Sequence, residues 1–239
     1  SGDLRMTLDQ QASGLAMATQ PIGADANVKK ALRQGDANRL LADWRPVFET
    51  LNRENHITHF YFFEEPLLRV HKPEKRGDRI ERFTALEAER TGKTVSGIEL
   101  GPLGTFTLRT VHPVFEGSAL VGYVELGKEI DDVLQTMHAR FGTQQAVVIR
   151  KEHLNRQTWE EGMRMFGREA DWERLPQSVV SWTSLGRLPD AFAVWANSFA
   201  DDHVHGETNR EIAFNGQNWR VSAIPLRDAS GKGVGDLLV

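Results

Sequence analysis

The stretch that decides the fold is LRTVHPVFEGSALVGYVELG, from Leu108 to Gly127. A similar stretch, WRVSAIPLRDASGKGVGDLLV, runs from Trp219 to Val239. In each, an alternating strand ends in a proline and one aliphatic residue, a small polar turn follows, and the next strand contains a glycine. The spacing between Pro113 and Pro225 is too long for a short solenoid repeat and suits two copies of a small domain. The sequence therefore predicts an internal duplication.

Composition is compatible with two folded units. The chain has 239 residues, of which 40% are hydrophobic, with 12 Phe and 6 Trp, enough for two cores. The formal net charge is -4, and no basic stripe with interleaved aromatic residues appears, which argues against nucleic-acid binding. The absence of cysteine excludes disulfides, thiol catalysis and Cys-based zinc sites. No phosphate-binding loop, dinucleotide fingerprint or hydrolase motif is present, so we expect no enzyme activity and no cofactor.

The first half of the chain predicts helices followed by strands. Helical spacing of apolar residues indicates one helix over about 4–20, broken by Pro21 and Gly23, a second up to Gly35, and a third from an Asp36 N-cap. Alternation then predicts a hairpin over 57–64 and 67–72. A helix over about 78–90 ends at Gly92, and three strands follow over 94–100, 105–113 and 119–127.

The second half repeats the end of this pattern. We expect a linking helix over 130–141, a strand over 144–150, and a mostly helical, Trp-rich stretch over 156–200. Strands over 209–214 and 217–226 are joined by Asn215-Gly216, a strong hairpin signal.

These elements predict an α+β fold: a long N-terminal helix followed by two PAS-like modules, each with an antiparallel sheet flanked by helices. The expected divisions are a helical stalk over 3–35, a first module over 36–129, and a linker helix with a second module over 130–239.

The stretch from Leu67 to Gly127 resembles the membrane-distal half of a double Cache sensor domain, of the type described as the double sensory domain of two-component sensor kinases. The residues that carry the resemblance are Arg69, His71, Pro73, Gly77, Asp78, Gly92, Gly97, Glu99, Leu108, Arg109, Pro113, Gly122, Glu125 and Gly127. Away from this stretch the similarity is one of architecture.

The resemblance implies the ligand-binding sensor domain of a bacterial transmembrane receptor, whether a histidine kinase, a chemoreceptor or a cyclic-dinucleotide enzyme. It further implies a periplasmic location, transmembrane helices on both sides of this sequence, and a homodimer in the full receptor. We expect a small polar ligand in the membrane-distal module, such as an organic acid or an amino acid, and a signal carried along the N-terminal helix.

Candidate ligand-binding residues cluster in the first module. Arg69 and His71 are two apart on a predicted strand and so share a face, while Arg109 lies on a later strand. These donors suit a carboxylate or another oxyanion. The acidic residues Asp78, Glu99 and Glu125 suit an amine on the same ligand, and the Tyr61 hydroxyl would orient it.

Each of these residues also has a structural interpretation. The arginines and carboxylates would then form ion pairs that bind nothing, Asp78 would cap a helix, and Tyr61 would belong to the core. The second copy of the repeat lacks the polar set, so we expect the first module to sense and the second to relay.

Two further interpretations remain open. The stretch DDHVHGE, from Asp201 to Glu207, has metal-like His-x-His spacing but no third histidine nearby, so we expect no metal site. The alternative function is a periplasmic protein-partner-binding module without a small-molecule pocket, which predicts an exposed apolar patch in the Trp-rich 156–200 stretch.

Overall fold

The computed structural model describes residues 2–63, 68–74, 81–199 and 206–239. The chain divides into two compact units. The first unit comprises Gly2–Glu99 and Thr107–Glu129, and the second comprises Leu100–Phe106 and Ile130–Val239. Each is described by itself.

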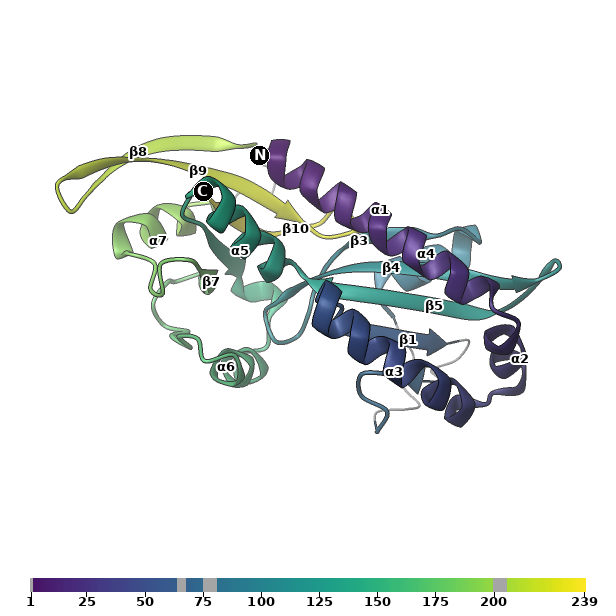
Figure 1. Ribbon diagram of the computed structural model, residues 1–239. Coiled ribbons are helices and arrows are strands. Elements are labelled where there is room, and N and C mark those ends of the chain that lie inside the picture. The colour runs from purple at the N-terminus through teal and green to yellow at the C-terminus, as the bar shows by residue number, and fades with distance from the viewer. Residues whose placement is uncertain (1, 64–67, 75–80, 200–205) are drawn as a thin grey trace. The chain divides into compact units, whose positions relative to one another are not determined.

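The first unit contains four described helices and a five-stranded antiparallel sheet (Figure 1). The sheet has the strand order β2-β1-β5-β4-β3. In chain order, its elements are α1 (Gly2–Ala24), α2 (Ala26–Gln34), α3 (Ala37–Asn55), β1 (His59–Phe63), β2 (Leu68–Arg69), α4 (Phe83–Thr91), β3 (Val95–Leu100), β4 (Phe106–Glu116) and β5 (Ala119–Glu129).

Helices cover both faces of this sheet because both faces are apolar. On one face, Phe60 and Phe62 of β1 meet Trp44 of α3, and α1 and α2 pack along β5. On the other face, Tyr61 and Phe63 pack with Ala85 and Ala88 of α4 and with neighbouring strand residues. Both aromatic pairs of β1 are therefore core, since successive strand side chains point to opposite faces.

Two predicted helix boundaries differ from the structure. Pro21 does not break α1, which continues to Ala24 because buried Ile22 anchors its last turn. Gly23 serves close packing instead, since a Cβ there would lie 2.7 Å from the His112 ring. The helix predicted over 78–90 begins at Phe83 in the described chain, with Arg82 in extended conformation before it.

The second unit repeats the architecture, with the strand order β7-β6-β10-β9-β8. Its elements are α5 (Ile130–Phe141), β6 (Ala146–Arg150), a short 3-10 turn (Lys151–His153), α6 (Arg156–Met165), β7 (Ser178–Thr183), α7 (Asp190–Asn197), β8 (Thr208–Phe214), β9 (Gln217–Arg227) and β10 (Gly233–Leu238). The prediction that 156–200 is helix and loop missed β7. This strand is buried on both faces, so its sequence does not alternate.

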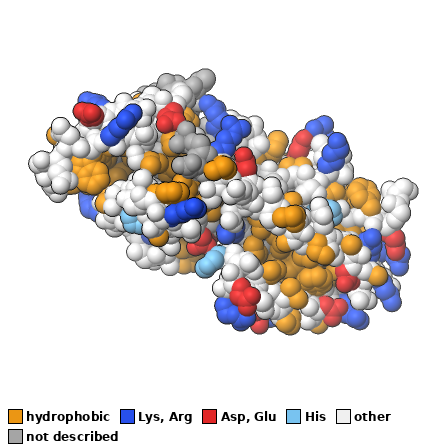
Figure 2. All heavy atoms as spheres, turned by 45° about the horizontal axis from the view of Figure 1, so that its top comes forward, with side chains coloured by type: hydrophobic (Ala, Val, Ile, Leu, Met, Phe, Trp, Pro, Cys, Tyr) orange, Lys and Arg blue, Asp and Glu red, His pale blue; other side chains and the backbone are white. Residues whose placement is uncertain are grey.

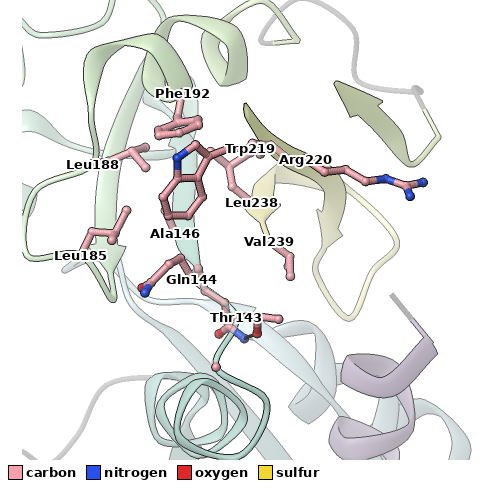
Figure 3. A pocket seen from close by; sticks show the side chains of 13 residues that line it. Thr143, Gln144, Ala146, Leu185, Leu188, Phe192, Trp219, Arg220, Leu238 and Val239 are labelled. Carbon is pink, nitrogen blue, oxygen red and sulfur yellow. Dashed lines mark hydrogen bonds between the residues drawn. The ribbon is translucent and has the colours of Figure 1, made fainter. Parts of the chain in front are cut away.

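A cavity of about 280 Å³ lies beside the core of the second unit (Figure 3). That core joins α7 to one face of β6, β9 and β10 through Phe192, Ala146, Val221 and Leu238, among others. The same four residues also line the cavity. The cavity therefore continues the apolar layer between the sheet and α7.

The surface mixes charged and apolar side chains, and Figure 2 shows hydrophobic patches between basic and acidic groups on one face. Large exposed hydrophobic residues include Met6 and Met17 on α1. Within the described ranges, the structure has no helix that is both long and apolar enough to cross a membrane.

Candidate functional site

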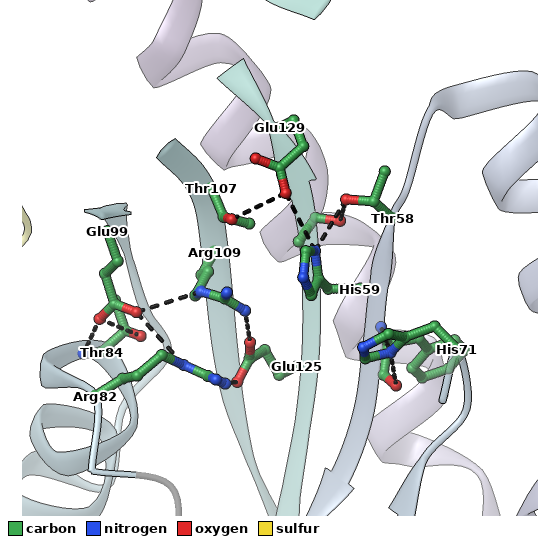
Figure 4. Close-up of polar contacts among 12 residues, drawn as sticks. Thr58, His59, His71, Arg82, Thr84, Glu99, Thr107, Arg109, Glu125 and Glu129 are labelled. Atoms are coloured by element: carbon green, nitrogen blue, oxygen red, sulfur yellow. Dashed lines mark hydrogen bonds and ion pairs between the residues drawn. The ribbon is translucent and has the colours of Figure 1, made fainter. Parts of the chain in front are cut away.

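Four charged side chains, of which three are buried and one is partly exposed, form a network on the α4 side of the first sheet (Figure 4). We call Arg82, Glu99, Arg109 and Glu125 the charge network. Arg109 of β4 donates to Glu125 of β5 at 2.7 Å and lies 3.3 Å from Glu99 of β3. Arg82 also pairs with Glu125 and lies 3.4 Å from Glu99. Two cations thus face two anions, which offsets the cost of burying each of them.

The N-terminus of α4 holds one member of the charge network in place. Glu99 Oε1 accepts hydrogen bonds from the Thr84 backbone N–H at 2.8 Å and from the Thr84 hydroxyl at 2.9 Å. A carboxylate is stabilised there because the first amides of a helix lack intrahelical acceptors. Glu99 therefore links the helix to the sheet as well as to the arginines.

Tyr61 lies between two arginines. The guanidinium carbon of Arg82 is 4.9 Å from the centre of the Tyr61 ring, and that of Arg69 is 5.7 Å from it. Both distances are in the range of cation–π attraction. The His71 ring packs against the same tyrosine at 4.8 Å. Tyr61 is thus a buried ring that contacts the predicted donors Arg69 and His71 and also Arg82 of the charge network.

Burial keeps two histidines next to the charge network neutral. Burial and, to a smaller extent, the positive charge of Arg109 lower the pKa of His59 to about 2. Burial also lowers the pKa of His71 to about 4, although the contact with the Phe60 backbone opposes this. With His71 neutral, its Nδ1 accepts the Phe60 N–H at 3.1 Å. At neutral pH these rings act as uncharged groups.

These lowered pKa values predict that the first unit loses stability in mild acid. Below pH 6.5 the unfolded chain binds protons that folded His59 and His71 do not, so the free energy of unfolding falls as the pH decreases towards 4. Each histidine contributes a slope of about 1.4 kcal/mol per pH unit in this window. Urea unfolding from pH 7 to pH 4.5 measures the slope. His71→Asn keeps an acceptor for Phe60 without titrating, and an unchanged slope in this variant would contradict the assignment.

The structure brings most of the predicted site residues together. Glu99, Glu125 and Arg109 lie in the charge network, and Arg69 and His71 surround Tyr61. Asp78 lies outside the described residues. Arg109 forms the ion pairs that the structural interpretation predicted, and Tyr61 is buried in the core.

The sequence pattern does not mark Arg82 or His59 as site residues. Arg82 falls inside the helix predicted over 78–90, and in such a helix the sequence does not show that its side chain reaches the sheet. In the structure it precedes α4 in extended conformation and reaches the sheet. No local signal marks this position, because the contacts of Arg82 come from distant strands.

Metal ligands do not gather in the described part of the chain, where no group of three His, Cys, Asp or Glu side chains is placed to hold an ion. Residues 201–205 of the DDHVHGE stretch lie outside that part. The site described above is therefore one of charged and aromatic side chains.

Comparison with known proteins defines the class. Residues 4–239 match the family of double Cache domains described as the double sensory domain of two-component sensor kinase. The chain belongs to this family. It is a sensor module with two PAS-like Cache units, and the module itself is not catalytic. No curated protein matches the chain in sequence.

Solved structures share the fold at low identity. The extracellular domain of a protein described as a histidine kinase, vpHK1S-Z8, is similar with a TM-score of 0.51 and 9% identity, covering 99% of this chain and 88% of that one. A domain from Vibrio parahaemolyticus, of a protein described as sensory box/GGDEF family, has a TM-score of 0.54 and 12% identity, covering 100% and 91%.

A more distant neighbour is the ligand-binding domain of Campylobacter jejuni chemoreceptor Tlp3 in complex with L-valine. It has a TM-score of 0.38 and 10% identity, covering 100% of this chain and 92% of that one. This likeness is too remote to transfer a ligand to this chain.

Proposed function

We propose that this chain is the periplasmic sensor region of a bacterial transmembrane receptor, and that its first unit binds a small organic acid or amino acid beside Tyr61. Arg69, His71 and the charge network would form the binding residues, with Asp78 in the adjoining segment. Family membership supports the sensor role. The position of the ligand is supported by the gathering of Arg69, Arg82 and His71 around one aromatic ring.

The net positive charge of residues 69–82 supports an anionic ligand. Residues 69–82 contain six Lys or Arg residues and only three Asp or Glu residues. This segment supplies Arg69, His71 and Arg82 to the surroundings of Tyr61. Even with Arg82 paired to Glu99 and Glu125, the basic residues of this segment outnumber its acidic ones, which gives the segment a positive field. A carboxylate is attracted by this field and matches the planar fork of an arginine.

The same geometry suggests how binding would reach α1. A ligand carboxylate that competes for Arg82 weakens its pairing with Glu125, and an amine on the ligand would take up the released carboxylate. Glu125 lies on β5, and Lys128 of that strand donates to Gln11 of α1 at 3.2 Å. A shift of β5 would therefore bias the packing of α1, the long helix that the resemblance assigns to signal transmission.

This route belongs to a larger proposal about the receptor. The stalk over 3–35 and the module over 36–129 would sense the ligand, and the part over 130–239 would relay the signal. Transmembrane helices would flank the sequence, and two receptors would pair as a homodimer. The alternative, a partner-binding module, would need an exposed apolar patch in 156–200. Its tryptophans Trp159, Trp182 and Trp195 are buried and cannot form one, so such a patch would consist of exposed side chains such as Met165 and Val194.

Ligand screening tests the proposal directly. Thermal-shift screening against amino acids, organic acids and amines, followed by calorimetric titration, should identify a carboxylate that stabilises the chain. Arg69→Ala should weaken its binding at least about tenfold, because a charge-assisted hydrogen bond is lost. Arg90→Ala is the matched control, since Arg90 is exposed in the same unit and pairs with Glu87. No stabilisation across the panel, or full affinity in Arg69→Ala, would reject this site.

A further inference from the structure

The two units can be compared residue by residue through their strand registers. In the first unit, Val114 of β4 pairs with Gly122 of β5, beside an irregularity in the register. In the second unit, Leu226 of β9 pairs with Gly235 of β10, again beside an irregularity. The strand orders of the two sheets also correspond, each strand of the second lying five later in the chain. These pairs therefore align the residues of the first unit with those of the second in one common frame.

In this frame, the charge network and Tyr61 have apolar counterparts. Glu125 lies three residues after Gly122, and Leu238 lies three after Gly235. Arg109 lies five residues before Val114, and Val221 lies five before Leu226. Tyr61 pairs with Glu125 across the strands, as Ala146 pairs with Leu238. Tyr61, Arg109 and Glu125 of the first unit thus correspond to Ala146, Val221 and Leu238 of the second.

These replacements explain the position of the cavity. Ala146, Val221 and Leu238 all line it, together with Leu188 and Phe192 from the α7 side. Alanine is smaller than tyrosine and valine is smaller than arginine, so these replacements leave space that larger side chains occupy at the corresponding positions of the first unit. Figure 3 shows Ala146, Leu188, Phe192 and Leu238 around the Trp219 indole, with the Arg220 side chain pointing away from them.

The wall of the cavity also contains polar atoms that have no hydrogen-bond partner among the described residues. One is Oε1 of Gln145, a residue only 2% exposed, and another is Nε1 of Trp219. Both residues line the cavity. A buried acceptor or donor without a partner costs stability, so such atoms in native proteins mark the place of a water or a ligand. Here one acceptor and one donor belong to residues of the cavity wall, which is otherwise mostly apolar.

We propose that the second unit has its own ligand site in this cavity, which takes a small uncharged molecule with an aromatic or branched aliphatic body and a hydroxyl or N–H group. The mostly apolar wall disfavours a charged ligand, because the side chain of Arg220, the one charged residue type in the lining, points away from the other lining side chains and leaves a carboxylate without a counter-ion. Size follows from volume: a cavity of about 150 Å³ holds benzene, so 280 Å³ holds a compound of about ten non-hydrogen atoms. The donor of the ligand would bond to Gln145 Oε1.

Titration of the whole chain with three probes tests this site. By calorimetry or ligand-observed NMR, p-cresol should bind saturably with a dissociation constant of about 1 mM or tighter. Toluene should bind more weakly because it lacks the hydroxyl, and 4-methylbenzoate should bind at least tenfold more weakly than p-cresol because of its charge. Absence of saturable p-cresol binding, or tighter binding of 4-methylbenzoate, would overturn the proposal.

Variants locate the binding. Ala146→Phe places a ring where Tyr61 stands in the first unit and should weaken p-cresol binding at least tenfold. Gln145→Leu should weaken p-cresol but leave toluene unchanged, and this contrast decides the matter if Ala146→Phe does not fold. Arg220→Ala is the control, because its side chain points away from the cavity. Arg69→Ala should leave p-cresol binding unchanged, which separates this site from the one in the first unit. Binding of p-cresol that survives both cavity variants would contradict the proposal.

Discussion

Glu125→Gln should lower the free energy of unfolding of the first unit by about 3–5 kcal/mol, because it leaves the buried Arg109 and the partly buried Arg82 facing one carboxylate. Glu125 is 0% exposed and contacts both Arg109 and Arg82. The amide keeps the shape of the side chain but not its charge. Denaturant unfolding, followed by circular dichroism, measures the loss.

A matched control is available in α4. Glu87→Gln removes a carboxylate that also pairs with an arginine, Arg90, but on the surface of the same unit. Water and salt screen such a pair, so the melting temperature of the Glu87→Gln variant should hardly differ from that of the original chain. If Glu125→Gln unfolds at the same denaturant concentration as the original chain, the charge network does not stabilise the fold.

A double variant separates charge balance from packing. Arg109→Val with Glu125→Leu removes one cation and one anion together and leaves Arg82 with Glu99. These are also the residues that the second unit has at the corresponding positions, Val221 and Leu238. The double variant should be more stable than Glu125→Gln alone, since no uncompensated charge remains buried. A double variant that is less stable than the single one would show that packing, not charge balance, dominates at these positions.

Gly235→Ala should have the second of the two largest effects, a loss of at least about 3 kcal/mol from the second unit. A Cβ at Gly235 would lie 2.1 Å from the Val148 carbonyl oxygen and 3.0 Å from the Ile149 Cα. Both are backbone atoms of β6, the neighbouring strand in the middle of the sheet, so no side-chain rotation relieves the clash. The strands must separate, and their hydrogen bonds lengthen.

Tryptophan fluorescence during urea unfolding reports this loss, because Trp159 is 0% exposed in the second unit. Gly14→Ala is the control: nothing lies within 4 Å of the Cβ position there, and alanine favours a helix over glycine by about 0.5–1 kcal/mol. We therefore expect Gly14→Ala to stabilise slightly and Gly235→Ala to destabilise strongly. Equal unfolding midpoints for the two variants would contradict the close packing of β10 against β6.

Local signals predicted those parts of the fold that depend on neighbours in sequence. Asn215-Gly216 predicted a hairpin, and both residues have positive φ, as such a turn requires. Asp36 caps α3 by accepting the Arg39 N–H, as expected. In contrast, alternation does not reveal β7, because this strand is buried on both faces. Pro21 does not end α1, because tertiary packing holds the last turn of the helix.

The candidate site was predicted only in part, for a similar reason. The sequence indicated Arg69, His71, Glu99, Arg109 and Glu125 as a group, because their charges recur within one stretch that resembles a sensor domain. It did not indicate Arg82, whose partners lie on β3 and β5. Nor did it show whether the acidic residues would bind a ligand or the arginines, since that depends on distances that spacing along the chain does not contain.

The sequence by itself indicated the duplication and most of the order of strands and helices, because these follow from local periodicity, turn residues and a repeated stretch. Its resemblance to a sensor family indicated the class of protein. Only the tertiary structure decided what the two copies contain. Register places Tyr61, Arg109 and Glu125 at the positions that Ala146, Val221 and Leu238 occupy in the second unit. In the first unit, charged side chains from β3, β4, β5 and the residue before α4 neutralise one another. In the second unit, smaller side chains on β6, β9 and β10 leave a cavity. Contacts between distant strands cannot be read from sequence spacing.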